Sequence, residues 1–158
     1  MRWVVIDSPI DELSVAVDDI GVCGVRFGAV EGAVEAHDAR LDAAVGEIRA
    51  YFAGELTDFT VPLSVRRGSD FERAVWHQMT LIPYGEMRTY GEVAAAVGDP
   101  GGARAVGVAC NRNPIPVIVP CHRIVGAGGK LVGFGGGLPR KRYLLELEAR
   151  VALQRAWQ

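Results

Sequence analysis

The sequence has no uninterrupted apolar run that approaches the roughly 20 residues needed to span a bilayer. It also lacks an N-terminal secretory signal, because Asp7 interrupts the apolar stretch that begins at Trp3. Neither sign of charge dominates, since 17 Lys and Arg residues accompany 19 Asp and Glu residues and leave a net charge of −2. These absences argue against a membrane protein and against a strongly basic protein that coats nucleic acid, and they predict a cytoplasmic location.

Cysteine is scarce: the 158 residues include only Cys23, Cys110 and Cys121, which are far apart and odd in number. This count argues against a disulfide framework. The absence of any CxxC pair argues against a four-ligand zinc site, so we expect no bound metal. At least one thiol is therefore free.

The residues that are present suit a folded, globular protein of one or two domains, with 49% apolar and 23% charged residues. Charge is unevenly distributed along the chain. Residues 1–68 contain 6 basic and 12 acidic side chains, whereas residues 69–158 contain 11 basic and 7 acidic ones. The change of sign suggests two functional surfaces, and the alternative is chance scatter in a short chain.

The first half predicts a small sheet and one helix. Three segments rich in Val and Ile are separated by turn residues, as in an antiparallel meander: 2–7, 13–17 and 22–27. Residues 36–53 repeat apolar side chains at helical spacing and are followed by Gly54, a common helix stop. We therefore expect residues 1–68 to form one α/β domain of uncertain role, which ends in a linker at residues 55–69.

The second half predicts a mainly helical domain, residues 69–158. Two capping boxes, Ser69 to Glu72 and Thr89 to Glu92, mark helix starts. The predicted helices span residues 70–81, 90–97, 103–110 and 140–155. A glycine-containing turn at residues 98–102 joins two of the short helices, an arrangement typical of a helix-turn-helix. The whole chain is therefore expected to be an α+β protein.

The helix predicted at residues 103–110 carries one long cation, Arg104, among small side chains. Recognition helices contact nucleic acid mainly through their first residues. A single arginine flanked by small residues suits insertion into a duplex better than reading many base edges. The alternative is a packed small-residue helix with a solvated arginine.

Three prolines within residues 114–120 precede Cys121, and residues 115–119 are otherwise apolar. Because proline favours extended backbone in the residue before it, we expect a stiff, buried strut that presents the thiol in one position. His122 and Arg123 follow, and cationic neighbours lower the pKa of a thiol. On an extended chain His122 would point away from Cys121, so we expect it to act as a base through a water molecule. The alternative is an inert buried cysteine.

A cysteine protease needs a distant histidine as its base, and only His37 and His77 remain for that role. His77 lies beside Trp76 in a predicted helix, which disfavours this alternative. The glycine-rich segments 126–129 and 133–137 match no phosphate-binding pattern. They predict a flexible hairpin and a side-chain-free loop that can offer backbone N–H groups to a flat ligand.

The segment Pro120-Cys121-His122-Arg123, followed by Ile124-Val125, resembles the active-site signature of the O6-alkylguanine-DNA alkyltransferases. Five further segments resemble the same family: Tyr51-Phe52-Ala53-Gly54-Glu55, Ile82-Pro83-Tyr84-Gly85-Glu86, Thr89-Tyr90-Gly91-Glu92, Ala103-Arg104-Ala105-Val106-Gly107 and Asn113-Pro114. The resemblance is strong over residues 51–150 and loose over residues 1–50. It implies a ribonuclease H-like N-terminal domain followed by the helix-turn-helix domain, in a stand-alone bacterial-type protein.

The resemblance implies direct-reversal DNA repair. The protein would bind the minor groove of double-stranded DNA, flip the damaged nucleotide out of the stack, and move the alkyl group of O6-alkylguanine or O4-alkylthymine onto Cys121. The thioether product does not hydrolyse, so each molecule would act once. The resemblance implies no cofactor, no membrane association, no obligate protein partner and a monomer.

The family pattern also implies roles for matching residues. Cys121 would accept the alkyl group, His122 would deprotonate it through a water, and Glu148 would orient His122. Tyr90 would contact the base and donate a proton or hydrogen bond to the leaving guanine, and Asn113 would brace the turns beside the cysteine. The expected DNA-binding residues, with Arg104 filling the gap in the base stack, are Thr89, Tyr90, Ala103, Arg104, Ala105, Gly107 and Arg112. The expected substrate-pocket residues are Cys110, Ile124, Phe134, Gly135 and Lys141.

Two pocket positions depart from the family pattern. Phe134 stands where many members have Tyr, so a hydroxyl is missing from the pocket wall, and Cys110 stands where a larger apolar residue is common. Cys110 would either widen the pocket or act as a second reactive thiol. Two other functions stay open: a non-catalytic protein that binds alkylated bases, disfavoured by the presence of Cys121, and a helix-turn-helix regulator, disfavoured by the few polar side chains at residues 103–110.

Overall fold

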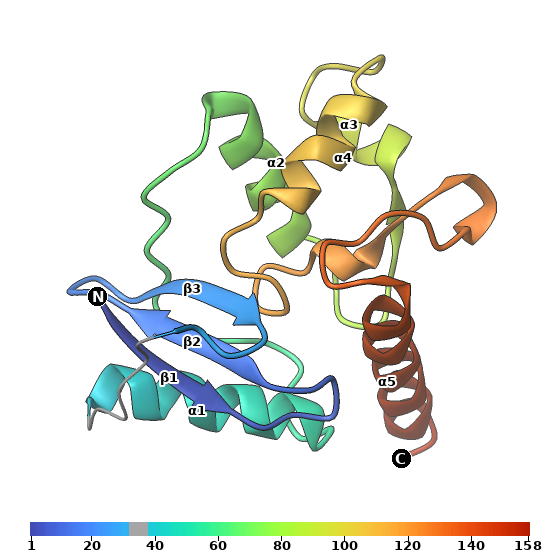
Figure 1. Ribbon diagram of the computed structural model, residues 1–158. Helices are drawn as coiled ribbons and strands as arrows, with labels where there is room; N and C mark the ends of the chain where they lie inside the picture. Colours follow the sequence, from blue (N-terminus) through green and yellow to red (C-terminus); the bar gives the residue numbers. More distant parts are fainter. Residues whose placement is uncertain (32–37) are drawn as a thin grey trace. The chain divides into compact units, whose positions relative to one another are not determined.

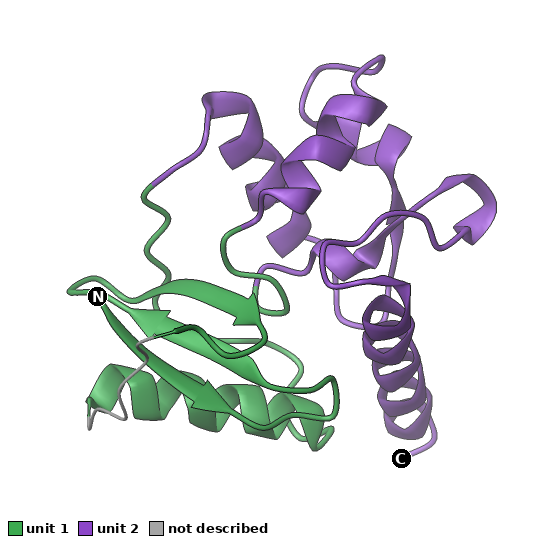
Figure 2. Ribbon diagram, viewed as in Figure 1, with its two compact units in different colours: residues 1–66, 114–118 green, residues 67–113, 119–158 purple. Residues whose placement is uncertain are grey.

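The computed structural model describes residues 1–31 and 38–158 and has an antiparallel sheet and several helices (Figure 1). The expected α+β fold class is therefore confirmed. The chain divides into two units (Figure 2): unit 1 comprises Met1–Arg66 and Pro114–Ile118, and unit 2 comprises Arg67–Asn113 and Val119–Gln158. Among the described residues, none of the helices combines the length and apolar character needed to cross a membrane.

Unit 1 is built on the predicted meander. Its strands are β1 (Arg2–Ile6), β2 (Leu13–Val17) and β3 (Val22–Phe27), and β2 pairs antiparallel with both neighbours. All five residues of β2 are buried. Helix α1 (Ala39–Phe52) packs along the sheet (Figure 1) and buries Leu41, Ala44, Ile48 and Tyr51, the apolar side chains at helical spacing. Residues 36 and 37 of the predicted helix lie outside the described residues.

Residues 114–118 differ from the expectation in both place and shape. The sequence predicts an extended strut in the C-terminal domain, but these residues belong to unit 1, where the N–H of Val25 donates to the carbonyl of Pro114 (3.0 Å). The segment is buried as expected, yet it reverses direction at Val117, whose φ is +73°. Pro116 followed by a residue of positive φ is the pattern of a type II turn. Proline fixes its own φ and restricts the residue before it, so Pro116 and Pro120 do not dictate the backbone of Val117.

Unit 2 contains the four other α-helices among the described residues: α2 (Asp70–Thr80), α3 (Tyr90–Ala96), α4 (Ala103–Asn111) and α5 (Leu138–Ala156). Both predicted capping boxes are confirmed, because Ser69 and Thr89 each exchange two hydrogen bonds with the glutamate three residues later. Helix α2 packs on α4, where the indole N–H of Trp76 donates to the carbonyl of Ala109 (2.8 Å). Helix α5 begins two residues earlier than predicted because Pro139 is tolerated in a first helical turn.

Short elements connect these helices in unit 2. Strand β4 (Arg88–Thr89) pairs in parallel with β5 (Ile124–Val125), which links the start of α3 to the segment after Cys121. Two 3₁₀ turns, η1 (Cys121–Arg123) and η2 (Ala127–Gly129), flank β5. This parallel pair holds the candidate nucleophile and the N-terminus of α3 in one framework.

Gly21 generates a prediction about stability. A Cβ atom at this position would lie 2.2 Å from the carbonyl oxygen of Pro62, the same oxygen that accepts the N–H of Val22. We expect Gly21→Ala to lower the free energy of unfolding by about 1–3 kcal/mol, because backbone must shift to accommodate the methyl group.

The matched control is Gly46→Ala in the interior of α1, where an added Cβ meets no atom within 4 Å. This substitution should instead raise the free energy of unfolding by about 0.5–1 kcal/mol, since alanine is the better helix former. Urea denaturation of both variants measures the difference, and changes of the same sign would contradict the assignment.

Candidate active site around Cys121

Cys121 is the first residue of the 3₁₀ turn η1 and does not lie at the end of an extended strut. Its N–H donates to the carbonyl of Val119 (2.8 Å), and the N–H of Arg123 donates to the carbonyl of Pro120 (3.0 Å). The expectation that Cys121 and His122 lie on extended chain is therefore wrong, because these two hydrogen bonds close a tight turn. Both side chains are buried, with Cys121 at 6% exposure and His122 at 0%.

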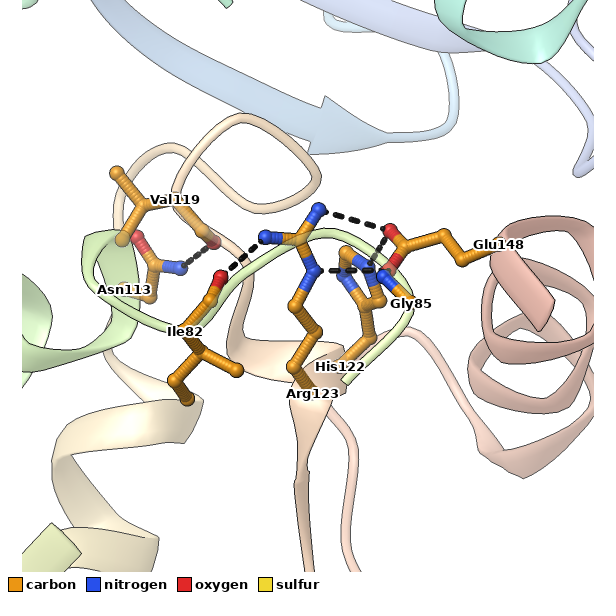
Figure 3. Close-up of polar contacts among 7 residues, drawn as sticks. All are labelled: Ile82, Gly85, Asn113, Val119, His122, Arg123 and Glu148. Atoms are coloured by element: carbon orange, nitrogen blue, oxygen red, sulfur yellow. Dashed lines mark hydrogen bonds and ion pairs between the residues drawn. The ribbon is translucent and has the colours of Figure 1, made fainter. Parts of the chain in front are cut away.

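The Glu148 carboxylate, on α5, is the centre of the polar network (Figure 3). Nε2 of His122 lies 2.7 Å from its Oε2, and Arg123 donates to it twice, from Nε to Oε1 (2.8 Å) and from Nη2 to Oε2 (3.1 Å). The backbone N–H of Gly85 donates to Oε1 (3.2 Å). A third nitrogen of Arg123, Nη1, donates to the carbonyl of Ile82 (2.7 Å). One carboxylate thus joins α5, η1 and the turn after α2.

These contacts determine the charge states of the network. Burial opposes ionisation of Glu148, but the hydrogen bond from His122 and the two from Arg123 outweigh it and lower the pKa of the carboxyl to about 2. Burial lowers the pKa of His122, although Glu148 acts in the opposite direction. At neutral pH the network therefore contains an ionised Glu148 and a neutral imidazole.

A neutral His122 that donates from Nε2 to Glu148 must carry a lone pair on Nδ1. This atom is buried and has no hydrogen-bond partner among the residues that the structure describes. A buried polar atom without a partner is costly and needs an explanation. Nδ1 of His122 is thus available to accept a proton.

The thiol of Cys121 has a raised pKa, contrary to expectation. Burial raises the pKa to about 11, and a hydrogen bond with the Asn113 side chain and the charge of Lys141 offset it only in part. The cations expected to lower this pKa do not do so, because Arg123 is bound to Glu148 and His122 is neutral. The resting nucleophile is a thiol that must lose its proton when it reacts.

Asn113 contacts three parts of the site. Its Nδ2 donates to the carbonyl of Val119 (2.8 Å), its N–H donates to the carbonyl of Cys110 (3.3 Å), and its side chain is hydrogen-bonded to Cys121. These contacts tie the end of α4 to the turn that carries the thiol.

A second group of residues lies around residues 126–137, which contain both glycine-rich segments and are called the glycine-rich loop below. The hydroxyl of Tyr90 donates to the carbonyl of Val132 (3.0 Å), and Nζ of Lys141 donates to the carbonyls of Val132 and Gly133 (both 3.1 Å). Burial raises the pKa of Tyr90 to about 12 and that of Cys110 to about 12, and both groups interact electrostatically with Cys121. The structure therefore brings four predicted residues together: Tyr90, Cys110, Cys121 and Lys141.

The other predicted pocket residues differ in exposure. Ile124, in β5, is fully buried, Phe134 is half-buried, and Gly135 is exposed in the glycine-rich loop. The part of the chain that the structure describes contains no group of three or more His, Cys, Asp or Glu side chains arranged to hold a metal ion.

Helix α4 presents the expected small-residue surface. Arg104, Ala105 and Val108 are exposed, Ala103 and Gly107 are half-buried, and the opposite face is buried through Val106 and Ala109. An added Cβ at Gly107 would lie 3.9 Å from the Tyr90 ring. The exposed face of α4 and Tyr90 are thus neighbours.

Two predicted DNA-binding side chains are already engaged within unit 2. The hydroxyl oxygen of Thr89 accepts the N–H of Glu92 at the start of α3. The guanidinium of Arg112 pairs with the Glu72 carboxylate (3.0 Å) and ties the end of α4 to α2. Neither this ion pair nor that of Arg123 with Glu148 was predicted from the sequence. Only the adjacency of Arg123 to Cys121 drew attention to that residue, and spacing could not reveal its distant partner.

Comparisons with known proteins identify relatives of both units. The model described as 6-O-methylguanine DNA methyltransferase, DNA binding domain, matches residues 70–150. The model described as 6-O-methylguanine DNA methyltransferase, ribonuclease-like domain, matches residues 1–65. Together the two matches cover most of the chain.

Individual relatives carry related names. A methylated-DNA–protein-cysteine methyltransferase of Mycobacterium tuberculosis is 61% identical over 105 residues, which are 66% of this chain and 63% of that protein, less than two thirds of its length. A protein of the same name from Methanosarcina acetivorans is 44% identical over 154 residues, 94% of this chain and 98% of that protein. The crystal structure of Mycobacterium tuberculosis OGT in complex with DNA has a TM-score of 0.86 and 48% identity, with 96% of this chain and 94% of that chain covered.

The Glu148 network predicts a specific dependence of stability on pH. Because the pKa of this carboxyl falls from its usual 4.5 to about 2 on folding, its ionised form stabilises the protein above about pH 4.5. That contribution is lost as the pH falls from about 4.5 towards 2. The free energy of unfolding of Glu148→Gln should not show this decrease between pH 4.5 and 2, because the variant has no carboxyl group to protonate. At neutral pH the variant should be less stable than the wild type by about 3–5 kcal/mol, because Arg123 keeps a buried, unpaired charge.

Urea denaturation between about pH 3 and pH 7 measures both effects. The matched control is Glu146→Gln on the exposed side of α5, which should follow the wild-type profile. A Glu148→Gln profile parallel to that of the wild type would contradict the assignment.

Proposed function

The chain belongs to the 6-O-methylguanine DNA methyltransferase family, and from this premise we propose that it repairs DNA by transferring the alkyl group of O6-alkylguanine to Cys121. The proposed substrate is double-stranded DNA, and O4-alkylthymine is a second proposed lesion. The product is a thioether, which water does not cleave at neutral pH. Each molecule would therefore act once, without a cofactor.

The observation that carries the proposal is the buried thiol beside a neutral histidine with an unused Nδ1. In the proposed reaction the proton of Cys121 passes through a water molecule to Nδ1 of His122, whose other nitrogen is held by Glu148. Sγ then attacks the alkyl carbon and the carbon–oxygen bond breaks. The electron pair of that bond goes to the guanine, which departs as an anion and takes up a proton to become the repaired base.

Tyr90 is the proposed donor to the leaving base. Burial raises its pKa to about 12, so its hydroxyl keeps its proton throughout the physiological range. A protonated phenol can stabilise the negative charge that develops on the guanine in the transition state. Asn113 has a supporting role, because it braces the thiol and the end of α4.

The proposed DNA-binding element is a helix-turn-helix formed by α3, the turn at residues 98–102 and α4. Its exposed face has small side chains that allow close approach to the minor groove, with Arg104 filling the space left by a flipped nucleotide. We assign DNA binding and transfer to residues 69–158, in line with their excess of basic side chains. Residues 1–68 would form a separate domain, and the protein would act as a cytoplasmic monomer.

Methyl transfer to Cys121 is the direct test. After the protein is mixed with a duplex that contains one O6-methylguanine, trypsin should release Cys121 in the peptide Asn113–Arg123 and Cys110 in Ala105–Arg112. We expect one added methyl group on the first peptide, saturating at one per protein molecule. Cys121→Ala is the matched control and should still bind the duplex. No methyl on either peptide, with lesion DNA still bound, would instead indicate a non-catalytic binding protein.

Arg104 provides a second test of the proposal. Arg104→Ala should slow transfer from duplex DNA by about 10-fold or more, because nothing then occupies the gap in the base stack. Transfer from free O6-benzylguanine should change by less than about 2-fold, because a free base needs no extrusion. Arg150→Ala, an exposed arginine on α5, is the control of equal charge change. Equal losses on duplex and free base would contradict a role in extrusion.

A further inference from the structure

Lys141 is a buried cation with unusual partners. Its side chain has 0% exposure, and within the described ranges it forms no ion pair with a carboxylate. Instead Nζ donates to the carbonyls of Val132 and Gly133 and lies 5.7 Å from the centroid of the Tyr90 ring. Burial of an ammonium group is costly unless such contacts compensate for lost water. A cation retained here against that cost needs a role.

The Tyr90 hydroxyl shares one of these carbonyls. It donates to Val132 O (3.0 Å), and its more distant acceptor is Gly133 O (3.5 Å). A phenol has a single O–H proton, so it cannot donate fully to the loop and to a base at the same time. In the proposed reaction Tyr90 must therefore release the loop when the alkylated base enters.

The other anchors of the loop bind residues outside 132 and 133. The N–H of Gly126 donates to Lys130 O (2.8 Å), the N–H of Gly137 donates to Phe134 O (2.9 Å), and Nη1 of Arg140 donates to Gly136 O (2.9 Å). Within the described residues, the side-chain hydrogen bonds to the carbonyls of residues 132 and 133 come from Tyr90 and Lys141. Once Tyr90 leaves, Lys141 is the side chain that still holds these carbonyls.

We propose that Lys141 is a positioning residue that holds the carbonyls of Val132 and Gly133 while Tyr90 exchanges Val132 for the alkylated base as its hydrogen-bond acceptor. The neighbouring Phe134 and Gly135 would then stay at the pocket wall during transfer. This inference rests on the proposed function for the step in which the base enters. The binding of Lys141 to the loop does not depend on that function.

A purely electrostatic role is the main alternative. Lys141 lowers the pKa of Cys121, and the ionisable groups that interact with its ammonium are Cys110, Cys121, His122 and Tyr90. If Lys141 acted only by favouring the thiolate, its removal would raise the pKa of the thiol. Every reaction of the thiolate, with the alkylated base or with a small electrophile, would then slow by the same factor. A positioning role predicts a loss confined to transfer from the base.

The experiment compares Lys141→Met with Lys130→Met, the same substitution at an exposed lysine of the same loop. Single-turnover transfer is measured over a range of concentrations of duplex containing O6-methylguanine. For Lys141→Met we expect the limiting rate to fall about 20-fold or more with the half-saturating DNA concentration within about 3-fold of wild type, because misplaced pocket walls slow chemistry more than binding. Lys130→Met should stay within about 2-fold of wild type for both quantities.

Alkylation of Cys121 by iodoacetamide, followed on the peptide Asn113–Arg123, then separates the two roles, because this small electrophile reacts with the thiolate and needs no positioned base pocket. Alkylation of Lys141→Met within about 3-fold of wild type supports positioning, whereas a loss equal to the loss in methyl transfer overturns it. A normal rate in Lys141→Met, or an equal loss in Lys130→Met, also overturns it.

Hydrogen exchange in the free protein tests the loop contact directly. Amides of residues 131–136 should exchange about 10-fold faster or more in Lys141→Met and less than about 3-fold faster in Tyr90→Phe, because Lys141 remains bound in the latter. Lys141→Gln, which keeps an N–H donor, is the substitute if Lys141→Met does not fold. Unchanged exchange in these Lys141 variants would overturn the inference. If the wild type transfers no methyl group, the proposed function fails, and the exchange data still report whether Lys141 holds the loop.

Discussion

The buried carboxylate of Glu148 is the constraint on which the candidate site depends. It lies on α5, yet its two oxygens accept hydrogen bonds from the side chains of His122 and Arg123 in η1 and from the N–H of Gly85 in the turn after α2. A carboxylate with this many donors stays ionised, and an ionised carboxylate forces the near nitrogen of His122 to be the donor. The tautomer of His122, and therefore the basicity of its other nitrogen, follows from a residue 26 positions later in the chain.

Burial has opposite consequences for the two reactive groups. It raises the pKa of Cys121 to about 11 and lowers the pKa of His122, so the resting pair is a thiol and a neutral imidazole. Such a thiol is protected from adventitious electrophiles, since the thiolate is the reactive form. Proton transfer between two neutral groups creates a charge pair, and Glu148 stabilises the imidazolium half of that pair. In the proposed reaction, activation of the nucleophile would thus wait for a substrate to occupy the site.

Local features were predicted from the sequence, and long-range pairings were not. The capping boxes at Ser69 and Thr89 involve residues three apart, so their sequence pattern contains all the information needed. The reversal at Val117 was missed because the surrounding prolines suggested extended chain, and packing in unit 1 decided otherwise. The role of Arg123 was misread for a related reason. Its position next to Cys121 in the sequence suggested that it acts on the thiol. In the fold its guanidinium instead binds the Glu148 carboxylate, which is distant in the sequence.

The same distinction explains why one cysteine differs from another in this chain. Cys110 is half-buried and Cys121 is buried, and both are thiols with raised pKa values that interact with Lys141. Cys121 begins a turn in which the next residue is a histidine bound to Glu148, and its side chain is hydrogen-bonded to Asn113. A raised pKa and a cationic neighbour are shared by the two thiols, so these features cannot select the nucleophile. The feature that can select Cys121 is its access to His122, whose tautomer is fixed by Glu148. That access depends on the turn Cys121–Arg123 and on α5.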